Sequence, residues 1–315
     1  MYKTLIAAAV SLMIAGCGPT DAPKTLEPAA PAPVAMPEPA PAPPAVTMAS
    51  PAEAFAAKLD ATLMGAHRND ANKARDGFRH PKESLNFFGF GPGMTVVEIT
   101  PGGGWYSEIL APTLKGEGTY VAAIIDPATV ESEGSRNYYT KSNTSFREKL
   151  AGDAALYDAT QVVEFNPSAP MFGPDASADL VLTFRNVHNW VGSNSVQPMF
   201  DGFFKVLKPG GVLGVVEHRA MADDTRDIKE LAETGYFPEA LVIEHATKAG
   251  FQLVEKSEIN ANPADTKDHP NGVWTLPPSL QMENVPEADH AKYKAIGESD
   301  RMTLKFIKPA TPTAG

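Results

Sequence analysis

Three consecutive glycines, Gly102, Gly103 and Gly104, separate an apolar run at 95–100 from an amphipathic stretch at 107–114. The first pattern is typical of a buried strand and the second of a helix. Glycines let the backbone approach a ligand closely, and the first N–H groups of a helix have no partner within it. In an open α/β sheet such a turn lies at the carboxyl end of its strand, where ligands bind. We therefore expect a cofactor at this turn.

Two acidic side chains accompany the glycines. Glu98 lies inside the strand before the turn, and Asp126 follows the next apolar run. A carboxylate in the second position can accept hydrogen bonds from ribose hydroxyls, which occur in both dinucleotides and adenosyl cofactors. The spacing Gly102-x-Gly104-x-x-Ser107 is also a partial dinucleotide fingerprint. These residues alone leave both cofactor classes open.

A second polar group, made of Arg185, Asn186, His188 and Asn189, follows a strand-like run at 180–184. In a parallel sheet these side chains would project over the same ligand-binding edge. An imidazole exchanges a proton near neutral pH, so His188 is the candidate base, and a buried structural histidine is the alternative. Arg185 would bind an anionic substrate, and the two asparagines would orient it. None of the seven histidines forms a helix-spaced pair with another ligand, so no metal site is expected.

Short apolar runs alternate with helical patterns along most of the chain, which predicts an α/β fold with a parallel sheet covered on both faces. Strands are expected at 95–100, 120–125, 162–165, 180–184, 212–217, 251–259 and 301–307. Helices are expected at 51–64, 107–114, 137–151, 196–207 and 239–249. The last strand is expected antiparallel beside the preceding one. We expect the polar segment 69–83 to be a connector or lid, and the helix-free interval 260–300 to wrap over an edge of the domain.

The passage 203–213, Phe-Phe-Lys-Val-Leu-Lys-Pro-Gly-Gly-Val-Leu, looks like the helix–LKPGG–strand passage of class I S-adenosylmethionine-dependent methyltransferases. Glu98 before the spaced glycines also matches their first motif. The chain therefore resembles this superfamily and, more narrowly, a bacterial group of predicted methyltransferases. The narrower resemblance is carried by residues 75–81, 98–112, 182–190 and 300–301.

The resemblance implies a Rossmann-like, doubly wound sheet of seven strands, mostly parallel, with S-adenosyl-L-methionine as the cofactor. It also implies that Gly102 and Gly104 approach the methionine part, that Glu98 supports the ammonium end directly or through water, and that Asp126 binds the ribose. Thr100 and Gly103 are expected to bind the cofactor as well. Thr100 and Pro101 stand where many members have Gly-Cys, and Asn166 replaces the usual acidic residue after the third strand. Adenine recognition is therefore left unassigned.

The composition narrows the function classes. The sequence has 27 Lys and Arg against 38 Asp and Glu, a net charge of −11, so we expect no nucleic-acid partner. We expect a methyltransferase acting on a small molecule or an envelope component. The alternatives are an NAD(P)-dependent oxidoreductase and a non-catalytic, lipid-anchored binding protein, because fold does not establish function.

The N-terminus resembles a bacterial lipoprotein signal. Lys3 precedes an apolar run at 5–14 that is too short to span a bilayer, and Ile-Ala-Gly leads to Cys17, the only cysteine. This implies a signal peptide at 1–17 with a lipidated Cys17, and it puts the domain at 51–309 and a tail at 310–315. Residues 18–50, with ten prolines and nine alanines, are expected to form a disordered linker.

The expected location is the cell envelope, with a lipid anchor and the domain facing the periplasm or the exterior. The outer membrane is favoured over the inner one, since Gly18 stands where an aspartate would argue for inner-membrane retention. S-adenosylmethionine is made in the cytoplasm. Either the cofactor reaches the envelope or the domain binds another ligand there.

We predict that Cys17 is acylated and that residues 1–16 are absent from the mature protein, because small residues directly precede the cysteine. The intact mass of the membrane-extracted protein checks this. A free thiol at Cys17 or a retained N-terminus would contradict the prediction.

Overall fold

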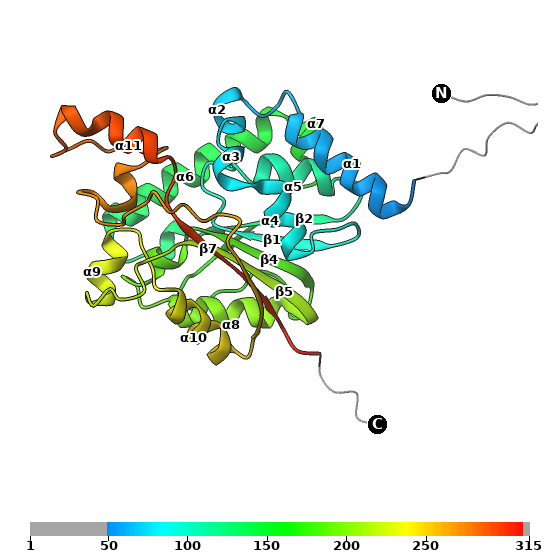
Figure 1. Cartoon of the computed structure of the whole chain (residues 1–315). Coiled ribbons are helices and arrows are strands. Elements are labelled where there is room, and N and C mark those ends of the chain that lie inside the picture. Colours follow the sequence, from blue (N-terminus) through cyan, green and yellow to red (C-terminus); the bar gives the residue numbers. More distant parts are fainter. Residues whose placement is uncertain (1–48, 311–315) are drawn as a thin grey trace, which may run out of the picture. The chain divides into compact units, whose positions relative to one another are not determined.

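The computed structural model describes residues 49–310 (Figure 1). The predicted signal peptide, Cys17, the linker up to residue 48 and the last residues, 311–315, lie outside this part. Seven strands form one sheet in the order β3-β2-β1-β4-β5-β7-β6. They are β1 Thr95–Ile99, β2 Thr119–Ile125, β3 Gln161–Phe165, β4 Ala178–Phe184, β5 Leu207–His218, β6 Gln252–Ser257 and β7 Arg301–Ile307.

The sheet has the mixed pairing that the sequence predicts. The strands from β3 to β5 are paired in parallel, whereas β7 lies antiparallel between β5 and β6. In the centre, Ile99 of β1 stands opposite Ala123 of β2 and Thr183 of β4, so these strands end at the same edge. The predicted α/β class, with a doubly wound, mostly parallel sheet and an antiparallel last strand, is confirmed.

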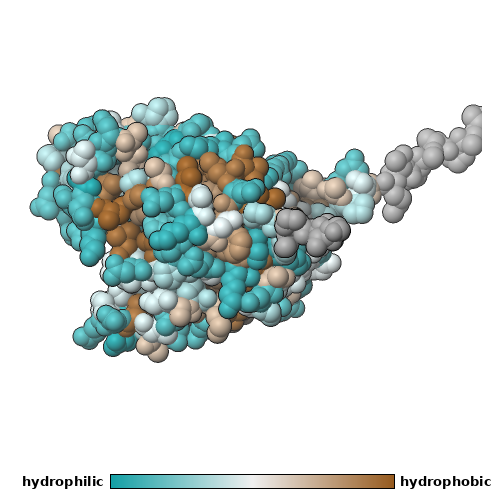
Figure 2. Space-filling view, turned by 90° about the horizontal axis from the view of Figure 1, so that it is seen from below, coloured by the Kyte–Doolittle hydropathy of each residue, from teal (hydrophilic) through white to brown (hydrophobic). Residues whose placement is uncertain are grey.

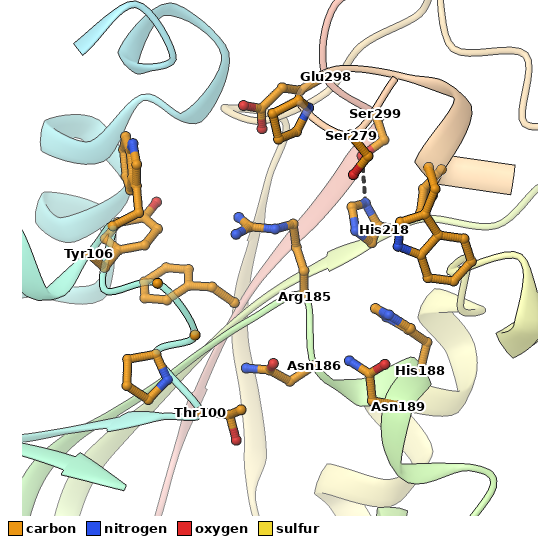
Figure 3. Close-up of a pocket in the computed structure, with 18 of the residues that line it drawn as sticks. Thr100, Tyr106, Arg185, Asn186, His188, Asn189, His218, Ser279, Glu298 and Ser299 are labelled. Atoms are coloured by element: carbon orange, nitrogen blue, oxygen red, sulfur yellow. Dashed lines mark hydrogen bonds between the residues drawn. The ribbon is translucent and has the colours of Figure 1, made fainter. Parts of the chain in front are cut away.

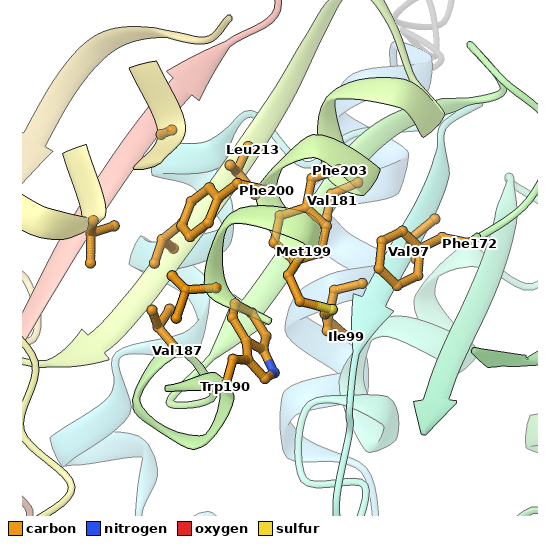
Figure 4. Packing of buried hydrophobic residues seen from close by; sticks show 14 of the residues in the cluster. Val97, Ile99, Phe172, Val181, Val187, Trp190, Met199, Phe200, Phe203 and Leu213 are labelled. Carbon is orange, nitrogen blue, oxygen red and sulfur yellow. The ribbon is translucent and has the colours of Figure 1, made fainter. Parts of the chain in front are cut away.

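Helices cover both faces of the sheet because neighbouring strand residues point to opposite sides. On one face, Phe200 and Phe203 of α8 pack with Val97, Ile99 and Val181 (Figure 4). On the other face, the cluster of Val96 and Leu182 includes residues of α1, α4, α5, α6 and α7. The helices are α1 Pro51–Met64, α2 Asp70–Lys73, α3 Asp76–Arg79, α4 Pro81–Phe88, α5 Ser107–Leu114, α6 Glu133–Gly152, α7 Ala154–Tyr157, α8 Val196–Val206, α9 Ile228–Glu233, α10 Glu239–Ala249 and α11 His290–Ile296.

The two segments expected as connectors contain short helices, which corrects the prediction. Residues 69–83 hold α2, α3 and the start of α4, and residues 260–300 hold α11. Helix α4 begins with Pro81 in its first turn and ends at Gly89, whose φ is 82°. Its buried face is Pro81, Ser84, Leu85 and Phe88. A face with only two large apolar residues gave too weak a periodic signal.

The surface seen in Figure 2 is mainly hydrophilic, with hydrophobic residues in separate groups, as an acidic composition leads one to expect. Between residues 49 and 310, no helix combines the length and the apolar character that crossing a membrane requires.

We predict that Gly214→Ala destabilises the domain, because α4 packs directly onto β5 at this glycine. A Cβ on Gly214 would lie 2.7 Å from Phe88 Cδ1 and 2.8 Å from Leu182 Cδ2. Overpacking of this kind costs about 1–3 kcal/mol of unfolding free energy, which urea denaturation measures. The control is Gly192→Ala on an exposed turn, where a Cβ would meet nothing within 4 Å. Equal stability of the two variants would contradict the proposed packing.

Candidate functional site

A cavity of about 770 Å³ lies at the carboxyl ends of β1 and β4 (Figure 3). This volume is within the range of sites for small molecules and cofactors. The glycine turn, the start of α6 and the turn after β4 contribute to its wall. Residues 273–274, 277–279 and 298–299 also line it, as do Asn72, Arg75 and Arg79 of the segment 69–83. The interval 260–300 therefore reaches over the ligand-binding edge of the sheet, where the sequence suggested only an edge of the domain.

The glycine turn leaves open space above its backbone. A Cβ added to Gly102 or Gly103 would meet nothing within 4 Å, and both residues line the cavity. Gly102 has a φ of 58°, in the region that glycine adopts most readily. Gly104 does not line the cavity, since its Cβ would lie 3.2 Å from Phe146 Cε2 of α6. Gly102 and Gly103 face the ligand space, and Gly104 serves helix packing.

The chain is strained where β1 and β4 end. Thr100 and Arg185 have φ values of 49° and 59°, although neither is glycine. Each is held by a backbone bond of 2.7 Å to a neighbouring strand, Thr100 N–H to Ala123 O and Arg185 N–H to Val216 O. Strain of about 1–3 kcal/mol per residue is typical of functional sites. Thr100 Oγ1 is also buried without a hydrogen-bond partner in residues 49–310.

Glu98 is a buried acid on the wall beside the glycine turn. Its Oε2 accepts from Ser107 Oγ at 3.0 Å and from Tyr120 OH at 2.5 Å. Burial raises the pKa of Glu98 to about 7, although these two hydrogen bonds act in the opposite direction. Within the described residues no group donates to Oε1. A cation entering the cavity would favour the ionised carboxylate.

His188 is oriented by a second buried acid, Glu217 at the end of β5. His188 Nδ1 lies 3.0 Å from Glu217 Oε1, and the same carboxylate accepts from the backbone N–H groups of Val187 and His218. Because a carboxylate only accepts, Nδ1 carries the proton and Nε2 of the neutral ring carries the lone pair. His188 lines the cavity, so this arrangement provides a base with a fixed orientation.

His218 lies on the same wall as His188, with ring centroids 5.6 Å apart. Burial lowers the pKa of His218 well below its ordinary value, and the positive charges of Arg185, Arg301 and Arg79 lower it further. Its Nδ1 lies 2.5 Å from Ser299 Oγ. His218 is therefore neutral at physiological pH.

A cluster of arginines surrounds Glu298, which also lines the cavity and directly precedes Ser299, the partner of His218. Glu298 accepts from Arg75 Nε at 2.6 Å, Arg79 Nε at 3.0 Å and Arg301 Nη1 at 3.1 Å. Burial on its own would raise the pKa of Glu298, but these guanidinium groups together with Arg185 lower it to about 2. Glu298 is ionised throughout the physiological range.

Most of the predicted site residues meet in this cavity. Eight of them line it: Glu98, Thr100, Gly102, Gly103, Arg185, Asn186, His188 and Asn189. Asp126 does not, because its Oδ1 accepts from Ala128 N–H at 2.9 Å and caps its own turn. Asn186 Nδ2 donates to Ile99 O at 2.8 Å, which joins the turn after β4 to the end of β1. The role of each side chain in binding or catalysis stays a prediction.

Sequence reasoning missed several residues of the wall. Tyr138 of α6 and Trp274 have no local pattern that marks them, and Glu298 was missed although it stands two residues before the segment 300–301. Glu217 could have been recognised from the sequence, because it is an acid at the end of an otherwise apolar strand. In residues 49–310 no group of three or more His, Cys, Asp or Glu side chains could hold a metal ion.

Comparison with known proteins bears on the fold. The structure is similar to that of the cyclase SpnF, with a TM-score of 0.50 and 15% identity over 82% of this chain and 93% of that one. It is also similar to a SAM-dependent methyltransferase from Aquifex aeolicus, with a TM-score of 0.48 and 16% identity over 75% and 93% of the two chains. A third similar structure is the glycopeptide N-methyltransferase MtfA with sinefungin, with a TM-score of 0.46 and 14% identity over 75% and 87%.

Sequence comparison adds no closer relation: no protein-family model matches the chain, and no curated protein matches it. At these identities the structural likenesses concern the fold alone. The chain has the Rossmann-like fold of class I methyltransferases.

We predict that Glu98 makes stability depend on pH. Between pH 4.5 and about 7 the folded state keeps a proton on Glu98 that the unfolded state has released. The free energy of unfolding therefore falls by about 3 kcal/mol as the pH rises through this window, and then levels off. Glu98→Gln should flatten this decline, as urea unfolding at several pH values measures. The control, Glu148→Gln on the exposed side of α6, should keep the wild-type slope. An unchanged slope in Glu98→Gln would contradict the prediction.

Proposed function

We propose that this protein transfers a methyl group from S-adenosylmethionine to a small molecule or an envelope component. One observation carries the proposal: a single cavity is lined by Glu98 and the glycine turn and also by the oriented base His188. The first group suits a cofactor with an ammonium end, and the second suits removal of a proton from an acceptor.

The residues present fit this cofactor. Glu98 would hold the ammonium group, because a buried carboxylate with a free Oε1 gains most from a cation. The open space above Gly102 and Gly103 admits a ligand against the backbone. Thr100 Oγ1 is a buried polar atom that still lacks a partner in the described chain. When bound, the cofactor supplies a methyl group on a positively charged sulfur.

His188 would accept a proton from the acceptor, and Glu217 would stabilise the charged ring that results. The nucleophilic atom of the acceptor would lose a proton as it receives the methyl group that the bound cofactor would supply. Nε2 of His188 takes the proton that the nucleophile loses, and Glu217 stabilises the resulting imidazolium. Neutral His218 beside it adds no charge that would oppose this step.

The proposal does not rest on the fold by itself, because the similar structure of SpnF is that of a cyclase. It also includes the location expected from the sequence. We propose that Cys17 anchors the domain to the cell envelope, so that the acceptor would be met outside the cytoplasm.

Binding by the full chain tests the proposal. We expect saturable calorimetric binding of S-adenosylmethionine and S-adenosylhomocysteine, and none of NAD or NADP. Absence of binding at millimolar S-adenosylmethionine would overturn the proposal and favour a binding protein for another ligand. Binding of NAD or NADP would instead favour an oxidoreductase.

We predict that Glu217→Gln separates binding from chemistry. The glutamine amide cannot accept from all three donors, so His188 loses its fixed tautomer. Transfer of labelled methyl groups to an envelope extract should fall by about 10²–10⁴-fold, while cofactor affinity changes little. Nitrogen NMR shifts of His188 report the tautomer directly. The control is Glu164→Gln in the exposed pair with Arg147. Loss of cofactor affinity in Glu217→Gln would place the residue in the binding wall.

A further inference from the structure

Arg185 stands out among the charged side chains of the cavity. It lines the wall, yet its guanidinium forms neither a hydrogen bond nor an ion pair with any group of residues 49–310. In Figure 3 its side chain extends into the cavity between Tyr106 and His218. Arg185 also keeps a φ of 59°, which directs an arginine inward at an energetic cost. A guanidinium held in this way lacks its natural partner, a carboxylate or phosphate.

The neighbouring charges do not supply that partner. Four arginines, Arg75, Arg79, Arg185 and Arg301, lie around one bonded carboxylate, Glu298. Arg185 acts on both Glu298 and Glu98 without an ion pair to either, so the arginines outnumber the carboxylates near them. Within residues 49–310, the guanidinium groups of Arg75, Arg79 and Arg301 have Glu298 as their only acidic partner. An excess of one sign is costly in a cavity of low dielectric unless a bound ion offsets it.

Several N–H donors of these arginines have no hydrogen-bond partner in the described residues. Arg75 uses only Nε toward Glu298, and its two terminal nitrogens donate to no group of the described chain. Arg79 is 3% exposed, and its Nη1 is buried without a partner. Its guanidinium lies over the ring of Trp105, 4.6 Å from the centroid. Arg75 and Arg185 thus offer direct contacts, and Arg79 and Arg301 add positive potential behind them.

The position of Arg185 places its positive charge close to the candidate base His188. Arg185 and His188 belong to the same turn after β4, so a molecule held by Arg185 lies beside the base. The glycine turn and Glu98, which line the same cavity, would hold the cofactor. The whole chain carries a net charge of −11, so a positive cavity reflects a local requirement rather than the general composition.

We propose that the methyl acceptor is a small organic anion, whose carboxylate or phosphate group binds Arg185 and Arg75 while its nucleophilic atom faces His188. This inference rests on the proposed function and names the substrate class of the same cavity. A hydroxyl, amine or acidic carbon of that anion would give its proton to Nε2 of His188.

The test uses the full chain with succinate and inorganic phosphate as probes and neutral succinamide as the reference. Calorimetry should show saturable binding of at least one anion and none of succinamide. Arg185→Met should weaken anion binding by roughly ten-fold to a hundred-fold, since it removes charge-assisted hydrogen bonds but keeps the side-chain length. Arg185→Lys should retain part of the anion binding, because lysine keeps the positive charge but lacks the planar, paired N–H donors of arginine. Arg147→Met, on the exposed side of α6, is the matched control and should bind like the wild type.

S-adenosylmethionine affinity, measured on the same variants, distinguishes the outcomes. Preserved cofactor binding with lost anion binding in Arg185→Met supports the proposal. Lost cofactor binding in Arg185→Met would overturn it, because the arginine would then hold the cofactor's own carboxylate. Equal binding of succinate, phosphate and succinamide would also overturn it, while leaving the methyltransferase proposal intact. Anion binding without any cofactor binding would leave the anion site but remove the proposed function.

Discussion

The carboxylate of Glu217 connects the strand ends on which the cavity depends. From the end of β5 it accepts from Val187 N–H and His188 Nδ1 in the turn after β4, and from His218 N–H in its own strand. A fully buried carboxylate is costly without such donors. Its bonds therefore hold the turn in place and help to keep the strained backbone of Arg185. Removing this one acid would release the base, the arginine and the end of β5 together.

Two groups in the cavity, the buried Glu98 and the arginines around Glu298, would each be stabilised by a ligand of opposite charge. Burial raises the pKa of Glu98 to about 7, so its ionised form would gain from a bound cation. Around Glu298, four arginines act on a single bonded carboxylate. The cavity is therefore suited to two ligands, or two ends of ligands, with complementary charges.

The parts predicted from sequence depend on local periodicity. The strand expected at 301–307 has those bounds in the structure, and Glu98, Gly102 and His188 meet because parallel strands end at one edge. Contacts between distant segments left no such signal: Arg75 and Glu298 are 223 residues apart. Asp126 shows a different limit. It lies at a strand end as expected, and its Oδ1 also caps a local turn, which the sequence did not indicate; its role toward a ribose stays a prediction.

The place of β7 in the sheet has a consequence for the order of assembly. Residues 301–307 enter between β5 and β6, and Glu298 directly precedes them. During synthesis, the six other strands and all the arginines except Arg301 emerge before this segment does. Until it arrives, β5 has an unpaired edge, β6 has no partner strand and Arg79 lacks Glu298 as its counterion. The nascent chain must therefore stay shielded from aggregation until its final strand inserts, and the cavity is completed last.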